Sequence, residues 1–279
     1  MTGHGTGSED CRTGQVLDRI GTALQKLGKV PGSVTPDDLA AVDEFHIGGD
    51  RASEDLLAQL GLGAADRVLD IGSGLGGTAR RMAGRYRCRV NGVDLNAEYA
   101  AVAAALSGWT GLSGETDFCQ GNASRLPFDA GVFDAASMLH VGMNIEDKAA
   151  VWSEVHRVLR PGARFGIYDI MRTAEGPLAY PLPWAASAAA SHVHAPQDYR
   201  QTLQDCGFAI IAERNRRQFA LDFFDEMRAQ LAAAGPPVLG TELLLGASTG
   251  ARTRNIIIGV SAGLVAPVEL IAQKRGARS

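Results

Sequence analysis

A glycine-rich turn after an apolar run is the strongest chemical signal in the sequence. Residues 68–71 are apolar apart from Asp70, and they lead into Gly72-Ser73-Gly74-Leu75-Gly76-Gly77. Glycine is needed where a backbone turns tightly and where a ligand must approach main-chain atoms closely, because a Cβ would block that approach. The start of a following helix would offer unpaired N–H groups to an anionic or carboxylate-bearing ligand. The pattern therefore predicts a ligand site that includes Gly72 and Gly74.

An acid at a fixed distance after this turn indicates a nucleoside ligand. Asp94 ends a second apolar run, 22 residues after Gly72. A carboxylate at the tip of a second strand can accept both hydroxyls of an adenosine ribose, in hydrogen bonds that its charge strengthens. Gly72-x-Gly74-x-x-Gly77 satisfies the dinucleotide pattern, whereas Gly72-x-Gly74-x-Gly76 preceded by Asp70 satisfies the S-adenosylmethionine pattern. The motif alone leaves both ligands open.

From residue 67 onward the sequence alternates apolar runs with helical patterns, which predicts βαβ units on a parallel sheet. These are the elements that must position the glycine-rich turn and Asp94. Expected strands are 67–71, 89–93, 117–120, 132–138, 164–170, 208–213 and 268–273. Expected helices are 15–27, 36–42 with Thr35 as its cap, 53–60, 78–85, 97–108, 148–159, 196–205 and one near 255–262.

The expected organisation is a flexible tail over residues 1–14 and a single domain over 15–279. Within the domain, 15–63 is a helical cap, 64–170 is the cofactor-binding core, and 171–195 and 220–263 are substrate-side insertions. Loops of this length are more often functional lids than idle connectors. The arginines in 80–89 are expected to lie on a solvated helix face and strand edge.

Composition excludes several classes of protein. The net charge of −4 argues against a nucleic-acid partner, and the longest nearly uncharged apolar stretch, 256–268, is too short for a bilayer that needs about 20 residues. Four scattered cysteines and no signal peptide predict a cytoplasmic protein with reduced thiols. His192 and His194 have no nearby Cys, His or carboxylate that would complete a metal site, so no metal is expected.

Five ordered motifs carry a resemblance to a known family. They are Val-Leu-Asp-Ile-Gly-Ser-Gly at 68–74, Val-Asp-Leu at 93–95, Gly-Asn-Ala at 121–123 before Leu-Pro-Phe, Phe-Asp at 133–134, and Leu-Arg-Pro-Gly-Ala-Arg-Phe at 159–165. This order resembles the class I S-adenosylmethionine-dependent methyltransferases over roughly residues 67–170. The resemblance implies S-adenosylmethionine as cofactor and S-adenosylhomocysteine as product. It also implies an α/β, Rossmann-like, seven-stranded sheet in the order 3-2-1-4-5-7-6, with strand 7 antiparallel and helices on both faces.

The resemblance also assigns cofactor contacts. Gly72 and Gly74 would face the methionine part, Asp94 the ribose, and Leu95 the adenine. Asn122 stands where many members have Asp, and its carbonyl oxygen can still accept from the adenine amino group while the Ala123 N–H meets the ring. Leu139 is a further expected cofactor contact.

Within that family the chain resembles the small-molecule branch that contains sarcosine and dimethylglycine N-methyltransferases. The similar stretches are Glu-Phe-His-Ile-Gly-Gly at 44–49, His-Val-Gly-Met-Asn-Ile at 140–145 and Tyr-Pro-Leu-Pro-Trp at 180–184. The resemblance and the position after the fourth strand make His140 the candidate general base. Expected substrate contacts are His46, Met143, Asn144, Tyr180 and Trp184. The chain has Gly48-Gly49 where the amino-acid enzymes are expected to offer an arginine to a substrate carboxylate.

The expected function is methyl transfer to a small-molecule acceptor, with an amine nitrogen as the first expectation. The alternatives are C- or O-methylation of a more apolar secondary metabolite, or a methyltransferase-like protein that binds the cofactor without methyl transfer. A third alternative is an NAD-linked oxidoreductase, but the sequence offers no obvious set of proton-donor residues for one. The apolar segment 239–268 is expected to cover the substrate crevice, to form a homodimer contact, or to do both.

Overall fold

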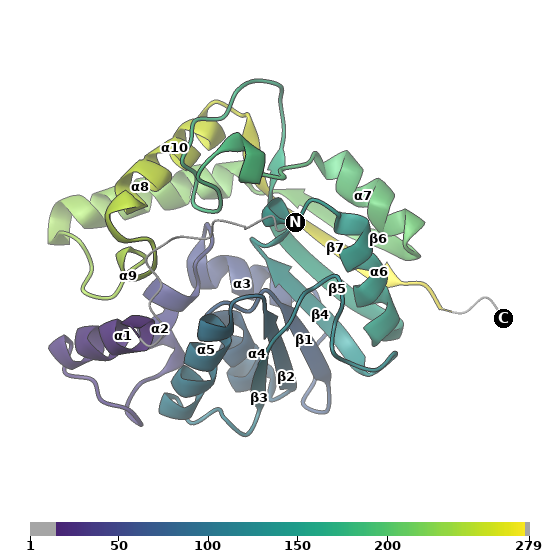
Figure 1. The fold of residues 1–279 in the computed structure, drawn as a ribbon, viewed down its shortest axis with the longest axis horizontal. Coiled ribbons are helices and arrows are strands. Elements are labelled where there is room, and N and C mark those ends of the chain that lie inside the picture. Colours follow the sequence, from purple (N-terminus) through teal and green to yellow (C-terminus); the bar gives the residue numbers. More distant parts are fainter. Residues whose placement is uncertain (1–14, 277–279) are drawn as a thin grey trace, which may run out of the picture.

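A seven-stranded sheet forms the centre of the computed structural model, which describes residues 15–276 (Figure 1). The predicted tail 1–14 lies outside the described residues. The strand order is β3-β2-β1-β4-β5-β7-β6, and β7 pairs antiparallel with β5 and β6, so the predicted fold class is confirmed. The strands are β1 (Arg67–Ile71), β2 (Arg89–Asp94), β3 (Thr116–Gln120), β4 (Phe133–Leu139), β5 (Leu159–Arg172), β6 (Phe208–Asn215) and β7 (Val265–Lys274).

Helices lie on both faces of this sheet and beyond its edge, and α8 and α10 lie side by side at the upper left of Figure 1. The helices are α1 (Gln15–Lys26), α2 (Pro36–Asp43), α3 (Gly49–Leu57), α4 (Gly77–Tyr86), α5 (Ala97–Trp109), α6 (Lys148–Val158), α7 (Pro196–Asp205), α8 (Arg217–Ala234), α9 (Glu242–Leu245) and α10 (Thr249–Ser261). Three short 3-10 turns are η1 (Gly142–Asn144), η2 (Ala188–Ala190) and η3 (Gly246–Ser248).

Two helices of the cap begin differently relative to the predictions. Thr35 caps α2 as expected, because its side chain accepts from the Asp38 N–H while the Asp38 carboxylate accepts from the Thr35 N–H. The third helix begins at Gly49, four residues before the predicted start at Ser53. Ser53 lies buried inside that helix, where its hydroxyl donates to Glu44 at 2.6 Å.

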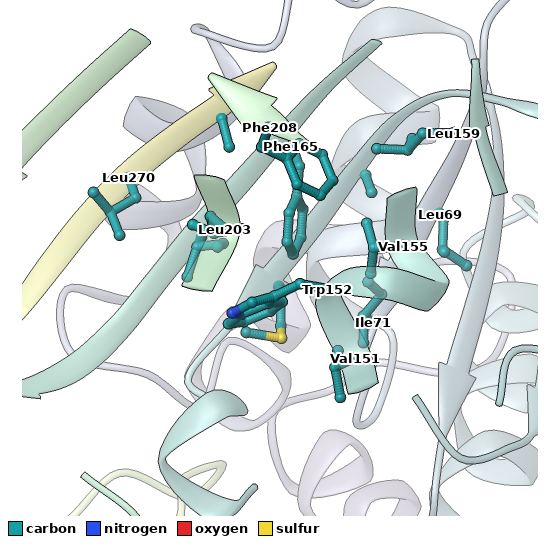
Figure 2. Close-up of a cluster of buried hydrophobic side chains, with 14 of the residues drawn as sticks. Leu69, Ile71, Val151, Trp152, Val155, Leu159, Phe165, Leu203, Phe208 and Leu270 are labelled. Carbon is teal, nitrogen blue, oxygen red and sulfur yellow. The ribbon is translucent and has the colours of Figure 1, made fainter. Parts of the chain in front are cut away.

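The largest hydrophobic cluster joins the sheet to α6 and α7. Trp152 and Phe165 are fully buried at its centre, and Figure 2 shows them among side chains of the strands and of both helices. In β1, Leu69 and Ile71 point into this cluster while Val68 points into a second cluster on the opposite face, with α3 and α4. This alternation is the period of two expected for a strand covered on both faces.

Strand register brings the ends of the central strands to one edge. Ile71 of β1 pairs with Val93 of β2 and with Met138 of β4, and all of these strands are parallel. The residues that follow them, Gly72, Asp94 and Leu139, therefore meet at the carboxyl edge of the sheet. Within residues 15–276, no helix has both the length and the apolar composition that a bilayer crossing requires.

The prediction for the arginines of α4 is wrong at two positions. Arg80 is fully buried and its guanidinium lies 2.5 Å from the Asp43 carboxylate, while Arg81 is 8% exposed and lies 2.9 Å from Glu44. The physical reason is that the cap helix α2 and the residues after it cover α4, so this face contacts acids rather than water. Arg80 also donates to the backbone carbonyl of Leu75, which ties the cap to the glycine-rich turn.

Candidate active site

The glycine-rich turn is held against β2 by main-chain hydrogen bonds. The Gly72 and Ser73 N–H groups both donate to the Val93 carbonyl, at 2.7 and 3.1 Å. Gly72 and Gly74 have φ values of +67° and +54°, which favour glycine. A Cβ on Gly72 would lie 2.3 Å from Val141, whereas a Cβ on Gly74 would meet no atom within 4 Å. Gly74 therefore faces open space, where a ligand can approach its backbone.

Asp94 joins the end of β2 to this turn. Its Oδ2 accepts from the Gly74 N–H at 2.9 Å, and its Oδ1 accepts from the Asn96 N–H at 2.8 Å. Partial burial raises the pKa of Asp94, and these two backbone donors oppose the rise. The carboxylate is thus oriented by the main chain, and its remaining lone pairs can accept further donors.

The predicted adenine contacts lie beside Asp94 along the same edge. Leu95 is 71% exposed, which is unusual for a leucine that follows a buried strand. The Asn122 side-chain oxygen accepts from both the backbone N–H and the hydroxyl of Ser124, at 2.9 and 2.8 Å. Asn122 therefore closes a turn, and the bond expected with the adenine amino group would have to be made in competition with the Ser124 hydroxyl. Ala123 packs on the central hydrophobic cluster.

A buried carboxylate oxygen lies at the end of β1. Asp70 is 2% exposed, and its Oδ1 accepts from the Ser137 hydroxyl at 2.8 Å. Its Oδ2 has no hydrogen-bond donor among the described residues. Burial raises the pKa of Asp70 to about 7, partly offset by the Ser137 hydroxyl. An unsatisfied buried carboxylate oxygen is costly, so the site suits a positively charged donor.

His140 lies at the end of β4 in a conformation that few residues other than glycine adopt. Its φ is +53°, and its N–H donates to the Tyr168 carbonyl at 2.7 Å. Its ring stacks on Tyr168, and its Nε2 is buried with no partner in residues 15–276. Burial and the neighbouring His46 lower the pKa of His140 well below 6.5, so the imidazole is neutral at pH 7. A neutral imidazole with an unpaired buried nitrogen is suited to exchange a proton or a hydrogen bond with a ligand.

His46 approaches His140 from the cap. The two rings lie edge to face with 5.8 Å between centroids. The His46 Nε2 lies 3.0 Å from the Gly49 carbonyl and 3.1 Å from the Ser53 hydroxyl, which in turn donates to Glu44. Burial lowers the pKa of His46 to about 4. The His46 side chain is only 5% exposed, so this nitrogen is occupied by the cap rather than directed at solvent.

The other predicted substrate contacts fall into two groups. Met143 is 3% exposed and Asn144 is exposed in η1, where the Asn144 amide donates to the Val141 carbonyl. Tyr180 and Trp184 pack on a separate hydrophobic cluster with Ile47, Leu182, Phe224, Ile256 and Val260. Since Ile47 follows His46 and its carbonyl accepts from the Tyr168 hydroxyl at 2.9 Å, this cluster borders the histidine pair. Leu139 is half-buried against the cluster under α3 and α4.

Tyr168 and Glu44 belong to the site although the sequence predicts no role for either. Tyr168 is fully buried on β5 and contacts both histidine rings, and Glu44 anchors the His46 network. Only the position of Tyr168 near the end of a predicted strand could have pointed to it. Among residues 15–276, no group of three or more His, Cys, Asp or Glu side chains could hold a metal ion.

A comparison with family models matches residues 69–167 to a family described as a methyltransferase domain. This segment runs from β1 through most of β5 and contains the glycine turn, Asp94 and His140. Residues 69–167 therefore match a methyltransferase domain. The predicted resemblance to the class I S-adenosylmethionine-dependent methyltransferases is thereby confirmed. The five ordered motifs lie within the matched residues, except that the first begins one residue before them.

The names of similar proteins specify methylation of different kinds of atom. The chain is 31% identical over 54% of each chain to a sarcosine/dimethylglycine N-methyltransferase of Halorhodospira halochloris. It is 26% identical over 63% of each chain to an O-methyltransferase of Penicillium expansum. The chain spans about a third of the length of the first curated relatives that it matches, 33% and 31%.

The solved structure of another protein has a similar fold over most of this chain. Geranyl diphosphate C-methyltransferase from Streptomyces coelicolor, in complex with Mg²⁺, a substrate analogue and S-adenosylhomocysteine, aligns with a TM-score of 0.66 at 21% identity. The alignment covers 80% of this chain and 75% of that one.

Proposed function

We propose that this chain is an S-adenosylmethionine-dependent methyltransferase that acts on a small molecule. The observation that carries the proposal is the Asp94 carboxylate, which the Gly74 and Asn96 N–H groups orient beside the glycine turn and the exposed Leu95. This arrangement supplies an acceptor for ribose hydroxyls, open backbone at Gly74 and an apolar surface for a flat ring.

The buried polar atoms of the site fit the rest of the cofactor. The Oδ2 of Asp70 would accept from the ammonium group of the methionine part, which would satisfy a carboxylate oxygen that has no donor among residues 15–276. Gly72 and Gly74 would bring their backbone against the same part, and Asn122, Ala123 and Leu139 would surround the base. When bound, the cofactor supplies a methyl group on a positively charged sulfur. Neighbours solved with this cofactor or its product support the assignment.

The residues around His140 would form the part of the site that binds the methyl acceptor, which we call the acceptor side. Much of the rate of methyl transfer can come from holding two reactants in line, which is worth on the order of 7–11 kcal/mol in well-oriented systems. His140, neutral and with a free Nε2, would accept a proton from an acceptor or orient it. Tyr168 and His46 would fix the ring of His140 for this role.

The charges near the acceptor side favour an apolar acceptor without a carboxylate. The guanidinium groups of Arg172, Arg217 and Arg252 donate to the backbone carbonyls of Gly176, Val260 and Leu182, respectively. Each of these guanidinium groups is thus tied to the backbone by at least one N–H group, and the cluster with Tyr180 and Trp184 is hydrophobic. We therefore place carbon or oxygen methylation of an apolar metabolite ahead of the amine nitrogen of a glycine-type acceptor, which would need a cation for its carboxylate.

Calorimetric titration and turnover test this proposal. We expect S-adenosylmethionine to bind and NAD not to bind. We then expect S-adenosylhomocysteine release with apolar phenols, alcohols or alkenes, and little release with sarcosine. A ¹³C-labelled methyl group would identify the modified atom by NMR. Binding without product from any acceptor would favour the alternative of a cofactor-binding protein that does not transfer methyl groups, and NAD binding alone would overturn the assignment.

Association and location form a further part of the proposal. A homodimer would cover apolar surface of the segment 239–268, and light scattering of the purified chain tests it by molar mass. The predicted cytoplasmic location is tested by fractionation of the producing cell.

A further inference from the structure

Lys148, the first residue of α6, is a buried cation whose ammonium contacts backbone carbonyls. It is 4% exposed, and its Nζ donates to the Ile145 and His192 carbonyls, both at 2.8 Å. The ammonium also lies 5.2 Å from the centre of the Tyr199 ring. Among the described residues, no carboxylate oxygen comes within 4 Å of this nitrogen. Burying an ammonium group costs free energy, and the hydrogen bonds to these two carbonyls offset part of that cost.

One of these carbonyls belongs to a long connection, residues 173–195, which we call the strap. In its middle, the Asn255 amide of α10 donates to the Pro181 carbonyl at 2.9 Å, and Arg252 donates to Leu182. Near its end, the His192 N–H donates to the Met143 carbonyl of η1 at 2.9 Å. The strap therefore runs from α10 to η1, past the carboxyl ends of β4 and β5, and it carries Tyr180 and Trp184.

Lys148 is the side chain that joins the two parts of this crossing. Ile145 directly follows η1, and His192 is in the strap, so a single ammonium holds both carbonyls. Of its two backbone partners, one is three residues away and the other 44 residues away in sequence. Without this cation, the end of the strap would keep one direct bond to η1, from His192 to Met143.

The groups that face Lys148 keep its ammonium protonated near neutral pH, but the ammonium loses its proton at moderately alkaline pH. Asp169 of β5, which accepts from the Tyr199 hydroxyl at 2.5 Å, and Asp198 of α7 favour the charged form. His192 and His194 lie on the strap side, and Tyr199 covers the ammonium with its ring. Burial outweighs the acids and lowers the pKa of Lys148 to about 8.

We propose that Lys148 is a positioning residue for the acceptor, because it fastens the strap to the η1 turn beside His140. This inference rests on the proposed function, since the acceptor is taken to lie between the strap and His140. It adds a specific residue that controls how firmly the acceptor side is closed.

Hydrogen exchange and kinetics of three variants test the inference. Lys148→Met removes both bonds, and Lys148→Arg keeps a cation that can donate to both carbonyls. Lys274→Met is a matched control, because the Lys274 Nζ also donates to two backbone carbonyls, at His156 and Leu159, on a different part of the sheet. We expect exchange at strap amides 185–194 to rise at least tenfold in Lys148→Met, and to stay near the parent value in Lys148→Arg and Lys274→Met.

The kinetic signature separates positioning from general damage. In Lys148→Met we expect the acceptor KM to rise at least tenfold, kcat to change less than KM, and the Kd for S-adenosylmethionine to stay within twofold. Parent-like strap exchange in a folded Lys148→Met, or an unchanged acceptor KM, would overturn the inference. The exchange result stands even if no acceptor is turned over, so it is independent of the proposed activity.

A pH series on the parent protein covers the case in which Lys148→Met does not fold. Corrected for intrinsic rates, strap exchange in the parent should rise between about pH 7 and 9 as Lys148 loses its proton. In Lys148→Arg the same rise should be absent, because an arginine stays charged. An equal rise in both proteins would contradict the role of Lys148.

Discussion

The ring of Tyr168 lies stacked on the ring of His140, with 5.2 Å between centroids and 24° between planes. Tyr168 is on β5 and His140 follows β4, so pairing of two neighbouring strands creates the contact. The Tyr168 hydroxyl also donates to Ile47 in the cap. The stack therefore fixes the candidate base between the sheet and the cap, where its Nε2 has no hydrogen-bond partner in the part of the chain that the structure describes.

Replacing the candidate base should affect turnover and not cofactor binding. For His140→Gln we expect kcat to fall by about 10²-fold or more, which is the usual range for loss of a general base. The Kd for S-adenosylmethionine should stay within a few-fold, as measured by calorimetry. Glu146→Gln, at an exposed position just after η1, is the control. An unchanged kcat in His140→Gln would mean that His140 is no base.

Loss of the Asp94 carboxylate should weaken cofactor binding. Asp94→Ala removes charge-assisted hydrogen bonds worth about 1.5–3 kcal/mol, so the Kd should rise about 10- to 150-fold. The substitution also frees the Gly74 and Asn96 N–H groups. Asn96→Ala is the comparison, because it removes the side-chain cap of α5 beside Asp94 and leaves the carboxylate and its two backbone donors in place. Equal losses in both variants would show that Asp94 acts only through the turn.

The stability of the cofactor-free protein should depend on pH through Asp70. Burial raises the pKa of Asp70 from 3.8 to about 7, so the native chain keeps a proton that the unfolded chain releases above about pH 4. The contribution of Asp70 to the unfolding free energy therefore falls as pH rises from about 4 to 7, by at most about 1.4 kcal/mol per pH unit. Asp70→Asn removes this fall.

Urea denaturation at several pH values measures the difference between the two proteins. Asp70→Asn should gain stability relative to the parent as pH rises from 4.5 to 7, and Asp117→Asn, at an exposed position on β3, should not. A difference that is constant over this range would argue against a protonated Asp70. With S-adenosylmethionine present, Asp70→Asn should bind more weakly than the parent.

The buried pair of Arg80 and Asp43 should be strongly coupled. Removing one partner leaves an uncompensated buried charge, so Arg80→Met or Asp43→Asn should each lower the unfolding free energy by about 3–5 kcal/mol. The double variant should lose clearly less than the sum of the two. Guanidinium denaturation gives these values, and Arg228→Met, from an exposed pair with Asp225, should show no measurable change. Additive losses would mean that the two residues stabilise the protein independently.

The sequence by itself determined the sheet and the cofactor edge. Apolar runs and glycines predicted the seven strands, because strand burial and tight turns depend on residue type at short range. The order of the strands followed from the resemblance to the methyltransferases, and the sheet has that order. The spacing of Gly72 and Asp94 placed both at one edge, since parallel strands end together. The division into cap, core and insertions stays a prediction.

Only the tertiary structure decided which side chains meet across long separations. The sequence predicts a solvated Arg80, because its partner Asp43 lies 37 residues away in the cap and charge patterns carry no information on such pairs. In the same way, His46, His140 and Tyr168 come from three segments that only the packed sheet and cap bring together. Local propensity fixes elements, whereas burial of polar groups depends on the partners that the whole fold supplies.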